Sequence, residues 1–491
     1  MKRAFRIVIT IIGIIAIALV LYKTIKVEEH ASFKQATGFG DLEIVITAND
    51  GAIHKVVPFS DSEGSYCFFL PACAKERSVF FENLTYYVKL YIDGQRIKEK
   101  TSLPSEILTG KELSAELRFG ADKTEACCLT FVFSDNEESF FFEAETDSVQ
   151  AVDSGMKKSL SGEMTVLASD GTVRCSEDVV KFSVLNDDEP DEEFQEEETY
   201  SYKIKLVKDV SPIPEADASD EWVLMADSGK VPGIGFERVF SVAGLFEESI
   251  VPQGNWVDLY ADGCYLGNYY FCEKTESIFK RLTLNGLNKE YKTLNNMFSS
   301  NKLRYRLNTD RTSRGLKANN PDDITGGYLI ERVPESLLTN KSSFFVTDSG
   351  IIYEVIYPKK ASFEMVEYLR TYFNEMEAAV SSEDGVNHET GKKIGDYLDL
   401  DSWADKYLTE EMFSEDNFHI DCSYLYKFPD ETDSHIYFGL YKAYDVYGAE
   451  QSGFCALYAD ELLKRPEVKE LIAKKRNVID KESTVDKRSD E

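Results

Sequence analysis

Residues 202–206 have the sequence YKIKL, in which apolar and basic side chains alternate. Alternation with a period of two is typical of a β-strand and places Lys203 and Lys205 on one face of it. Residues 256–271, WVDLYADGCYLGNYYF, contain two runs rich in aromatic and β-branched residues on either side of a DG dipeptide. This pattern predicts a β-hairpin. The middle of the chain is therefore expected to be rich in β-strands.

The β pattern continues toward the N-terminus, over residues 40–150. Runs such as LEIVI at residues 42–46 and YYVKLYI at residues 86–92 favour strands, and the NDG and DG sequences after them favour hairpin turns. We therefore expect residues 27–150 to form a small all-β, sandwich-like module that spaces or presents the next domain. A carbohydrate-binding module is the functional alternative.

Helical patterns come after the strands. Ser362 is placed to cap a helix in which apolar residues recur at spacings of three and four. A second helix is expected to begin near residues 401–402, and a last one to cover residues 459–475. Residues 476–491 form a charged tail that we expect to be disordered. Strands followed by helices predict a two-lobed α+β domain over residues 151–475. The apolar positions of the first helix are Val366, Leu369, Phe373 and Met376.

The chain is strongly acidic, with 87 acidic and 55 basic residues among 491 and a formal net charge of −32. A charge of this sign repels phosphate backbones, so a nucleic-acid partner is not expected. The acidity is greatest at residues 187–198, which hold nine Asp or Glu residues and are expected to form a solvated loop. The nine cysteines include no CxxC pair, which argues against a zinc knuckle.

The first 26 residues predict a membrane anchor. A basic start precedes an unbroken apolar run at residues 7–22, and no small-residue cleavage site comes after it. A run of this length is at the short end of those that cross a bilayer, and the basic start keeps the N-terminus in the cytoplasm. We therefore expect a single-pass membrane protein, anchored by an N-terminal helix, whose C-terminal bulk is extracytoplasmic. A cleaved signal peptide is the alternative.

Four groups of short motifs occur in a fixed order along roughly residues 160–475. They are YKIKL (202–206) with WVLMA (222–226), VDLY (257–260) with GNYYFCEK (267–274), ITGGYLIE (324–331), and YLDLDSW (397–403) with YLYK (424–427) and YD (444–445). In order and spacing they resemble the spore coat protein H (CotH) family of atypical, kinase-like proteins of Gram-positive, clostridial type. The preceding β-rich stretch resembles the leading module of clostridial members.

The resemblance implies a bilobal, kinase-like fold that transfers phosphate from ATP to secreted proteins, with Mg²⁺ or Mn²⁺ as the metal. It implies that Lys205, or its neighbour Lys203, contacts the ATP phosphates, and that Glu273 lies on a strand similar to a kinase hinge. Members of the family also carry a glycine-rich phosphate cradle. The corresponding residues 182–188, FSVLNDD, contain neither Gly nor Arg, so backbone amides are not expected to close on phosphate there.

Two further positions depart from the family pattern. The family's catalytic Asp, ten residues before the Lys of the YLYK motif, corresponds to Asn417, with Asp416 beside it. Asparagine does not accept a proton, Asp416 is displaced by one residue, and His419 is an alternative base. The family's metal-binding WDxD motif corresponds to KAYD, which keeps Asp445 but has Ala443 in place of the first Asp. One carboxylate is a poor Mg²⁺ site by itself.

These departures predict a CotH-type pseudokinase that acts as a surface or spore-coat binding or scaffold protein. Its expected partners are secreted or coat proteins, or a cell-wall polymer. The first alternative is an active atypical kinase that uses Asp416, Asp445 and Lys205 in a rearranged geometry. The second is a cell-surface adhesion or polysaccharide-binding protein.

One short stretch of this acidic chain is basic. Such a stretch is suited to an acidic partner segment or an anionic polymer. Pairing with the protein's own acidic surface is the alternative. The basic residues are Arg304, Arg306, Arg311, Arg314 and Lys317.

Overall fold

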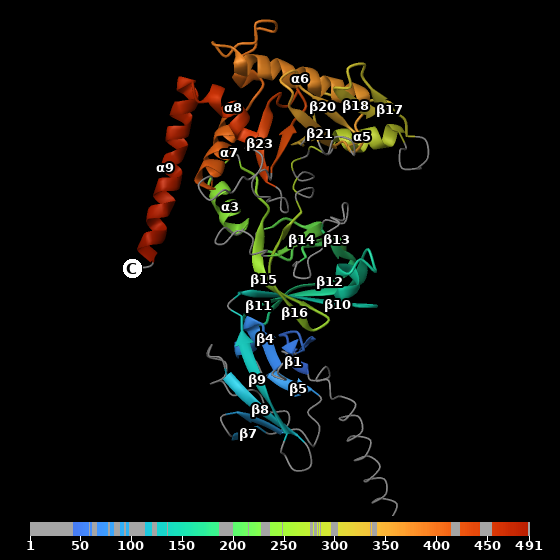
Figure 1. Ribbon diagram of the computed structural model, residues 1–491, viewed down its shortest axis with the longest axis vertical. Coiled ribbons are helices and arrows are strands. Elements are labelled where there is room, and N and C mark those ends of the chain that lie inside the picture. The colour runs from blue at the N-terminus through green and yellow to red at the C-terminus, as the bar shows by residue number, and fades with distance from the viewer. Residues whose placement is uncertain are drawn as a thin grey trace, which may run out of the picture. The chain divides into compact units, whose positions relative to one another are not determined.

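The computed structural model describes residues 43–489, with interruptions, and divides into two compact units (Figure 1). The first unit comprises residues 1–220 and 255–271, and the second comprises residues 221–254 and 272–491. The interruptions of five or more residues within the described range are residues 61–65, 83–88, 98–112, 120–124, 186–199, 227–235, 296–302, 336–340, 414–422 and 442–453.

Two β-sheets form the N-terminal part of the first unit. Three strands pair in the order β2-β1-β5, and six pair in the order β3-β4-β9-β8-β6-β7. These strands fall within the β-rich module predicted at residues 27–150. Their bounds, with one 3-10 helix, are β1 Glu43–Thr47, β2 Ile53–Val56, β3 Phe59–Ser60, β4 Tyr66–Leu70, η2 Ala72–Glu76, β5 Val79–Glu82, β6 Lys89–Ile92, β7 Gln95–Ile97, β8 Leu113–Phe119 and β9 Glu125–Phe133.

The next seven strands close into a barrel, in the order β10-β11-β12-β13-β14-β16-β15. Parallel pairing between β10 and β15, with Phe140 opposite Leu259, closes it. Antiparallel ladders join β10 to β11, β11 to β12 and β12 to β13. The bounds are β10 Glu138–Ala144, α2 Val149–Asp153, β11 Leu160–Ala168, β12 Val173–Val184, β13 Tyr202–Val210, β14 Ser219–Ala226, β15 Gly254–Ala261 and β16 Cys264–Glu273.

Aromatic side chains form the core of the barrel. Phe182 stacks on Phe142 and packs against Tyr202, with ring centroids 4.4 and 4.7 Å apart, and all three side chains are buried. Along β13 the alternation of the YKIKL sequence has the expected effect, because its apolar residues are buried while Lys203 and Lys205 are partly exposed.

The barrel contradicts the predicted bilobal, kinase-like α+β fold, and more residues of the structure lie in strands than in helices. The prediction was wrong because alternation identifies strands but not their partners. It assigned residues 138–144 to the leading module and residues 254–261 to the following domain. In the structure these two segments are the neighbouring strands β10 and β15 of one closed barrel.

A seven-stranded sheet with the order β17-β18-β20-β21-β19-β22-β23 forms the centre of the second unit (Figure 1). Helix α6 contacts β18 and β20, and helix α7 contacts β23, α8 and α9. The bounds are α3 Phe236–Ala243, α5 Gly286–Asn295, β17 Tyr305–Leu307, β18 Ser313–Leu316, β19 Tyr328–Arg332, β20 Phe344–Val346, β21 Ile352–Tyr357, α6 Phe363–Ser381, η4 Ile394–Asp396, α7 Leu400–Phe413, β22 Ser423–Lys427, β23 Ile436–Tyr441, α8 Phe454–Leu462 and α9 Pro466–Ser489.

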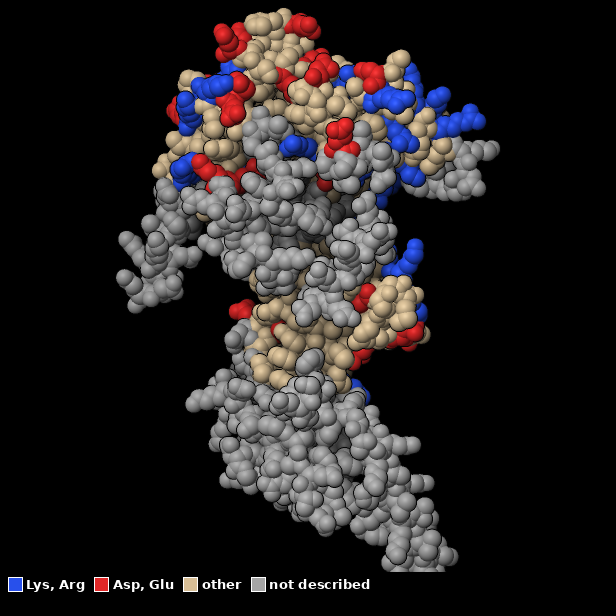
Figure 2. Space-filling model, viewed as in Figure 1, with Lys and Arg blue, Asp and Glu red and all other residues tan. Residues whose placement is uncertain are grey.

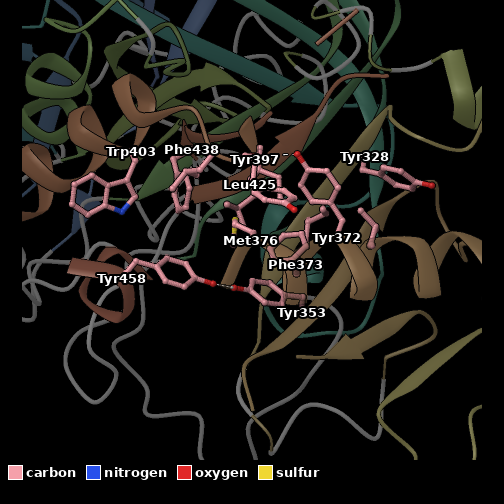
Figure 3. Close-up of a cluster of buried hydrophobic side chains, with 14 of the residues drawn as sticks. Tyr328, Tyr353, Tyr372, Phe373, Met376, Tyr397, Trp403, Leu425, Phe438 and Tyr458 are labelled. Atoms are coloured by element: carbon pink, nitrogen blue, oxygen red, sulfur yellow. Dashed lines mark hydrogen bonds between the residues drawn. The ribbon is translucent and has the colours of Figure 1, made fainter. Parts of the chain in front are cut away.

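Helix α6 begins where the sequence predicts. The Ser362 hydroxyl accepts a hydrogen bond from the Met365 N–H at 3.1 Å, so it caps the first turn. The predicted apolar positions of α6 are buried in a core rich in aromatic rings, shown in Figure 3. The single helix predicted at residues 459–475 is instead two, because Pro466 starts a new helix at a position where its missing N–H is tolerated.

No helix in the described part of the chain is long and apolar enough to cross a membrane. The two longest helices, α6 and α9, carry charged side chains along their length. This finding contradicts the predicted transmembrane anchor and, with it, the single-pass location with an extracytoplasmic bulk. The apolar run at residues 7–22, on which that prediction rested, lies outside the described residues.

Candidate functional site

Several predicted site residues lie outside the described residues. They are the predicted base Asn417 with its neighbour Asp416, the alternative base His419, and the predicted metal ligand Asp445. The acidic segment at residues 187–198 also lies outside them. The roles assigned to these residues from the sequence therefore stay predictions.

Lys205 is described, and its ammonium group forms an ion pair. Its Nζ lies 2.7 Å from Oδ2 of Asp220, which is at the start of β14. Both side chains are partly exposed, at 44% for Lys205 and 27% for Asp220, so solvent screens the pair and its contribution to stability is small. The pair nevertheless places a carboxylate where the resemblance implies an ATP phosphate.

Glu273 is the last residue of β16 and is only 1% exposed. Its Oε2 accepts a hydrogen bond from the main-chain N–H of Gln253 at 3.0 Å, and its own N–H donates to the Gln253 carbonyl at 3.0 Å. The carboxylate therefore ties the end of β16 to the residue that precedes β15. This contact gives Glu273 a structural role.

Two of the motifs behind the CotH resemblance meet in the second unit. Strand β19 begins within ITGGYLIE and pairs antiparallel with β22, which contains YLYK, so that Tyr328 is opposite Lys427. A Cβ at Gly326 would lie 2.0 Å from the carbonyl carbon of Phe428, and Gly327 has a φ of +84°. Only glycines allow the turn before β19 to approach β22 so closely.

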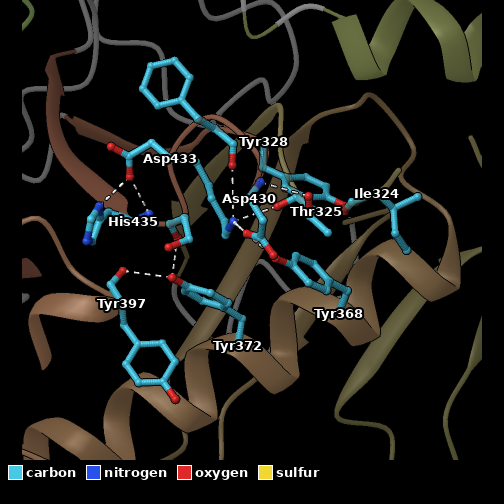
Figure 4. Close-up of polar contacts among 12 residues, drawn as sticks. Ile324, Thr325, Tyr328, Tyr368, Tyr372, Tyr397, Asp430, Asp433 and His435 are labelled. Carbon is cyan, nitrogen blue, oxygen red and sulfur yellow. Dashed lines mark hydrogen bonds and ion pairs between the residues drawn. The ribbon is translucent and has the colours of Figure 1, made fainter. Parts of the chain in front are cut away.

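Lys427 connects the two turns at this junction, and Figure 4 shows its partners Thr325 and Asp430. Its side chain is completely buried, and its Nζ donates to the carbonyls of Thr325 and Phe428 at 2.8 and 3.3 Å and to Oδ1 of Asp430 at 2.5 Å. The ammonium also lies over the ring of Tyr372, 4.9 Å from its centroid. Three acceptors therefore match the three N–H donors of the ammonium.

Asp430 links this lysine to the surrounding loops. The Tyr368 hydroxyl donates to its Oδ1 at 3.2 Å, and its own main-chain N–H donates to the Thr325 hydroxyl at 3.0 Å. The Thr325 hydroxyl in turn donates to Asp323 at 2.7 Å. Asp430 is 43% exposed, so water also reaches the carboxylate.

Burial changes the protonation of this group of residues. Burial lowers the pKa of Lys427, while the hydrogen bond and charge of Asp430 oppose that change. Burial and the negative charge of Asp430 also raise the pKa of Tyr368 well above its ordinary value. The Tyr368 hydroxyl therefore stays protonated at neutral pH and serves as a hydrogen-bond donor.

A histidine of the second unit is also held by hydrogen-bond partners on both sides of its ring. The His435 ring lies between Oδ1 of Asp433, 2.5 Å from Nδ1, and the carbonyl of Gly395, 2.7 Å from Nε2. The Tyr437 hydroxyl donates to the other oxygen of Asp433 at 2.8 Å. Burial tends to raise the pKa of Asp433, but the hydrogen bonds from His435 and Tyr437 outweigh it and lower this pKa. Both ring nitrogens are thus engaged within the protein.

This arrangement is suited to fixing loops rather than to chemistry on a substrate. The amine of Lys427 is enclosed by its acceptors, and the His435 ring has no nitrogen left to act as a base. Within the described residues, no three side chains of His, Cys, Asp or Glu come together as a metal site. From the sequence, Gly326, Gly327 and Lys427 were recognised only as parts of motifs, and their role in positioning the backbone was missed. A signal for their role was present, because two adjacent glycines before an apolar strand indicate close backbone approach.

Comparisons with known proteins add no identification, because no family model matches the sequence and no curated protein matches it.

Proposed function

We propose that this chain is a CotH-family binding or scaffold protein rather than an ATP phosphotransferase. The observation that carries the proposal is the ion pair between Lys205 and Asp220. An ATP phosphate at Lys205 would have to displace the Asp220 carboxylate or lie beside it. A phosphate and a carboxylate that share one lysine are both negative and repel each other. The substitutions at Asn417 and Ala443 in the family-like motifs point in the same direction.

The buried junction of β19 and β22 supports the same proposal. Part of the sequence behind the family resemblance is used there to position backbone, through the glycines at 326 and 327 and the ammonium of Lys427. Selection for a folded binding domain would keep such residues even where residues needed for phosphate transfer were lost. The resemblance is therefore compatible with a protein that binds a partner and does not modify it.

The proposal is tested by thermal unfolding of the full chain with ATP, with and without Mg²⁺ or Mn²⁺, together with transfer of labelled phosphate. We expect neither metal-dependent stabilisation nor transfer, and no difference between Lys205→Ala and the matched control Lys203→Ala. Any ligand that binds the folded state would raise the unfolding midpoint. Metal-dependent transfer that is lost in both Lys205→Ala and Asp445→Ala would instead establish an active kinase.

A further inference from the structure

The basic stretch of the sequence forms a hairpin at one edge of the seven-stranded sheet. Strands β17 and β18 pair antiparallel, with Arg306 opposite Gly315, and β17 is the outermost strand. Lys and Arg side chains gather over the end of the second unit that carries these two strands, as Figure 2 shows against Figure 1. The basic edge, as we call it, consists of Arg304, Arg306, Arg311, Arg314 and Lys317.

Only part of the positive charge of the basic edge is neutralised by the described residues. Arg306 lies over the ring of Phe363 and is 3.8 Å from a Glu364 oxygen. Arg314 stacks on a tyrosine and donates to a main-chain carbonyl, neither of which carries a negative charge. The exposed residues Arg304, Arg311 and Lys317 form no ion pair within the described part of the chain. Among the described residues, at most one of the five basic residues, Arg306, is therefore paired with the protein's own acidic surface.

The backbone of β17 offers hydrogen-bonding groups at the same edge. The Lys317 N–H donates to the Arg304 carbonyl and the Asn308 N–H to the Ser313 carbonyl, so these alternate residues face β18. In an antiparallel ladder the residues between them, Tyr305 and Leu307, direct their N–H and C=O groups to the other side. Nothing in the described residues pairs with that outer side of β17. Leu307 also has a side chain that is 50% exposed.

Charge on this edge determines which strands are able to add to it. An exposed edge strand is a template for another chain, and like charges along it repel a second copy of the same edge. An acidic strand is attracted instead. Arg304 and Arg306 are two residues apart and share one face of the strand, with Lys317 across the hairpin from Arg304. Their spacing, about 6.8 Å along the strand, equals that of alternate side chains in a second strand.

We propose that β17 binds an extended acidic peptide segment of a partner protein by strand addition, with Asp or Glu at alternate positions facing Arg304, Arg306 and Lys317. This inference rests on the proposed binding function and names its partner class. Strand addition supplies main-chain hydrogen bonds for affinity and side-chain contacts for specificity. A phosphate polymer would match the charge but has no amide groups to pair with Tyr305 and Leu307.

The probe is a fluorescein-labelled peptide of alternating Glu and Thr, titrated with the full chain by fluorescence anisotropy at low salt. We expect saturable binding that weakens strongly at about 1 M salt, where the Debye length is about 3 Å. A peptide of the same composition with its Glu residues in one block should bind more weakly. An alternating peptide with N-methylated amides should also bind more weakly, because it keeps the charges and loses the main-chain donors.

Two double variants, each of which replaces two basic residues by Glu, test whether the peptide binds at the basic edge. Arg304→Glu with Lys317→Glu should weaken binding about tenfold or more, because two attractive contacts become repulsive. Lys469→Glu with Lys474→Glu, on exposed residues of α9, should leave it unchanged. Equal weakening in both variants would overturn the inference, as would equal binding of the N-methylated peptide or tighter binding of inorganic polyphosphate.

Mass spectrometry of the peptide recovered after incubation with the chain and ATP distinguishes a failure of this inference from a failure of the proposed function. A peptide that binds at β17 and gains a phosphate from ATP would refute the non-catalytic function while leaving the binding surface in place. A chain that neither transfers phosphate nor binds the alternating peptide would refute the binding surface alone.

Discussion

Lys427 shows what a single buried charge requires. Transfer of an ammonium from water to a protein interior is costly unless its donors are satisfied and a counter-charge is near. Here two main-chain carbonyls and the carboxylate of Asp430 accept its three hydrogen bonds, and aromatic rings cover it. The same residue thereby fixes the turn before β19 and the turn after β22.

Replacement of Lys427 by Met should destabilise the second unit by about 1–3 kcal/mol, since the partly buried carbonyl of Thr325 would lose its donor. The measurement is the change in the midpoint of urea unfolding. Lys464→Met is the control, because Lys464 lies in the turn after α8, is 65% exposed and pairs only with the partly exposed Glu461 among the described residues. An equal shift in both variants would contradict the structural role of Lys427.

Glu377 is a second polar residue in the core of this unit. It is 7% exposed and accepts hydrogen bonds from Ser349 at 2.6 Å and from Tyr458 at 2.9 Å, and Tyr458 also bonds to Tyr353 (Figure 3). Burial raises the pKa of Glu377, although these hydrogen bonds lower it in part. The folded state therefore retains the proton to a higher pH than the unfolded state does.

The direction of this pKa change determines how the contribution of Glu377 to folding stability depends on pH. A carboxyl with a raised pKa contributes stability below its unfolded pKa, near 4.3, and this contribution is lost as the pH rises through the folded pKa. Glu377→Gln should therefore become more stable relative to the natural protein as the pH increases from about 4 to 7. Unfolding midpoints of both proteins across this range provide the measurement. A stability difference that is constant with pH would show that Glu377 is not perturbed.

At the scale of elements, the junction of β19 and β22 depends on the absence of one side chain. A Cβ at Gly326 would lie within 2.1 Å of three backbone atoms of Phe428 and Pro429, which have no freedom to move aside. Gly326→Ala should therefore cost at least about 3 kcal/mol of folding free energy or prevent folding of the second unit. Gly286→Ala is the control, because nothing lies within 4 Å of a Cβ there. Circular dichroism and thermal unfolding of both variants distinguish the two outcomes.

Local patterns in the sequence predict individual elements of this protein well. The YKIKL alternation identifies β13, and the cap at Ser362 with the periodicity behind it identifies α6, because each pattern is complete within a few residues. The closure of the barrel depends on pairing between β10 and β15, and nothing in either strand specifies the other. The fold class depends on such long-range pairing, and it was therefore predicted wrongly from the sequence.

For the same reason, the sequence predicted where some residues of the candidate site lie but not which residues they contact. Lys205 was expected on an exposed face of a strand and lies there, but its partner Asp220 belongs to a different strand. The enclosure of Lys427 depends on Thr325 and Tyr372, about 100 and 55 residues away in the chain. Side-chain environments of this kind arise from tertiary packing and are absent from local composition.

At the scale of the whole molecule, charge is the dominant property. A net charge of −32 destabilises a compact chain through self-repulsion, and salt screens that repulsion. The thermal unfolding midpoint should therefore rise as sodium chloride increases from about 0.02 to 0.5 M. Tetramethylammonium chloride should have a similar effect if screening is the cause. A midpoint that falls with both salts would show that attractive ion pairs, and not repulsion, control stability.

The parallel pairing of β10 with β15 also affects how the protein is made. A ribosome produces β10 well before β15, because roughly 120 residues separate their paired positions. At ordinary rates of translation this interval lasts on the order of 10 s. During that time the aromatic residues of β10, Phe140 to Phe142, have no parallel partner strand and remain available to other nascent chains. A chaperone that binds apolar strands would therefore be most needed after residue 144 leaves the ribosome and before residue 261 does.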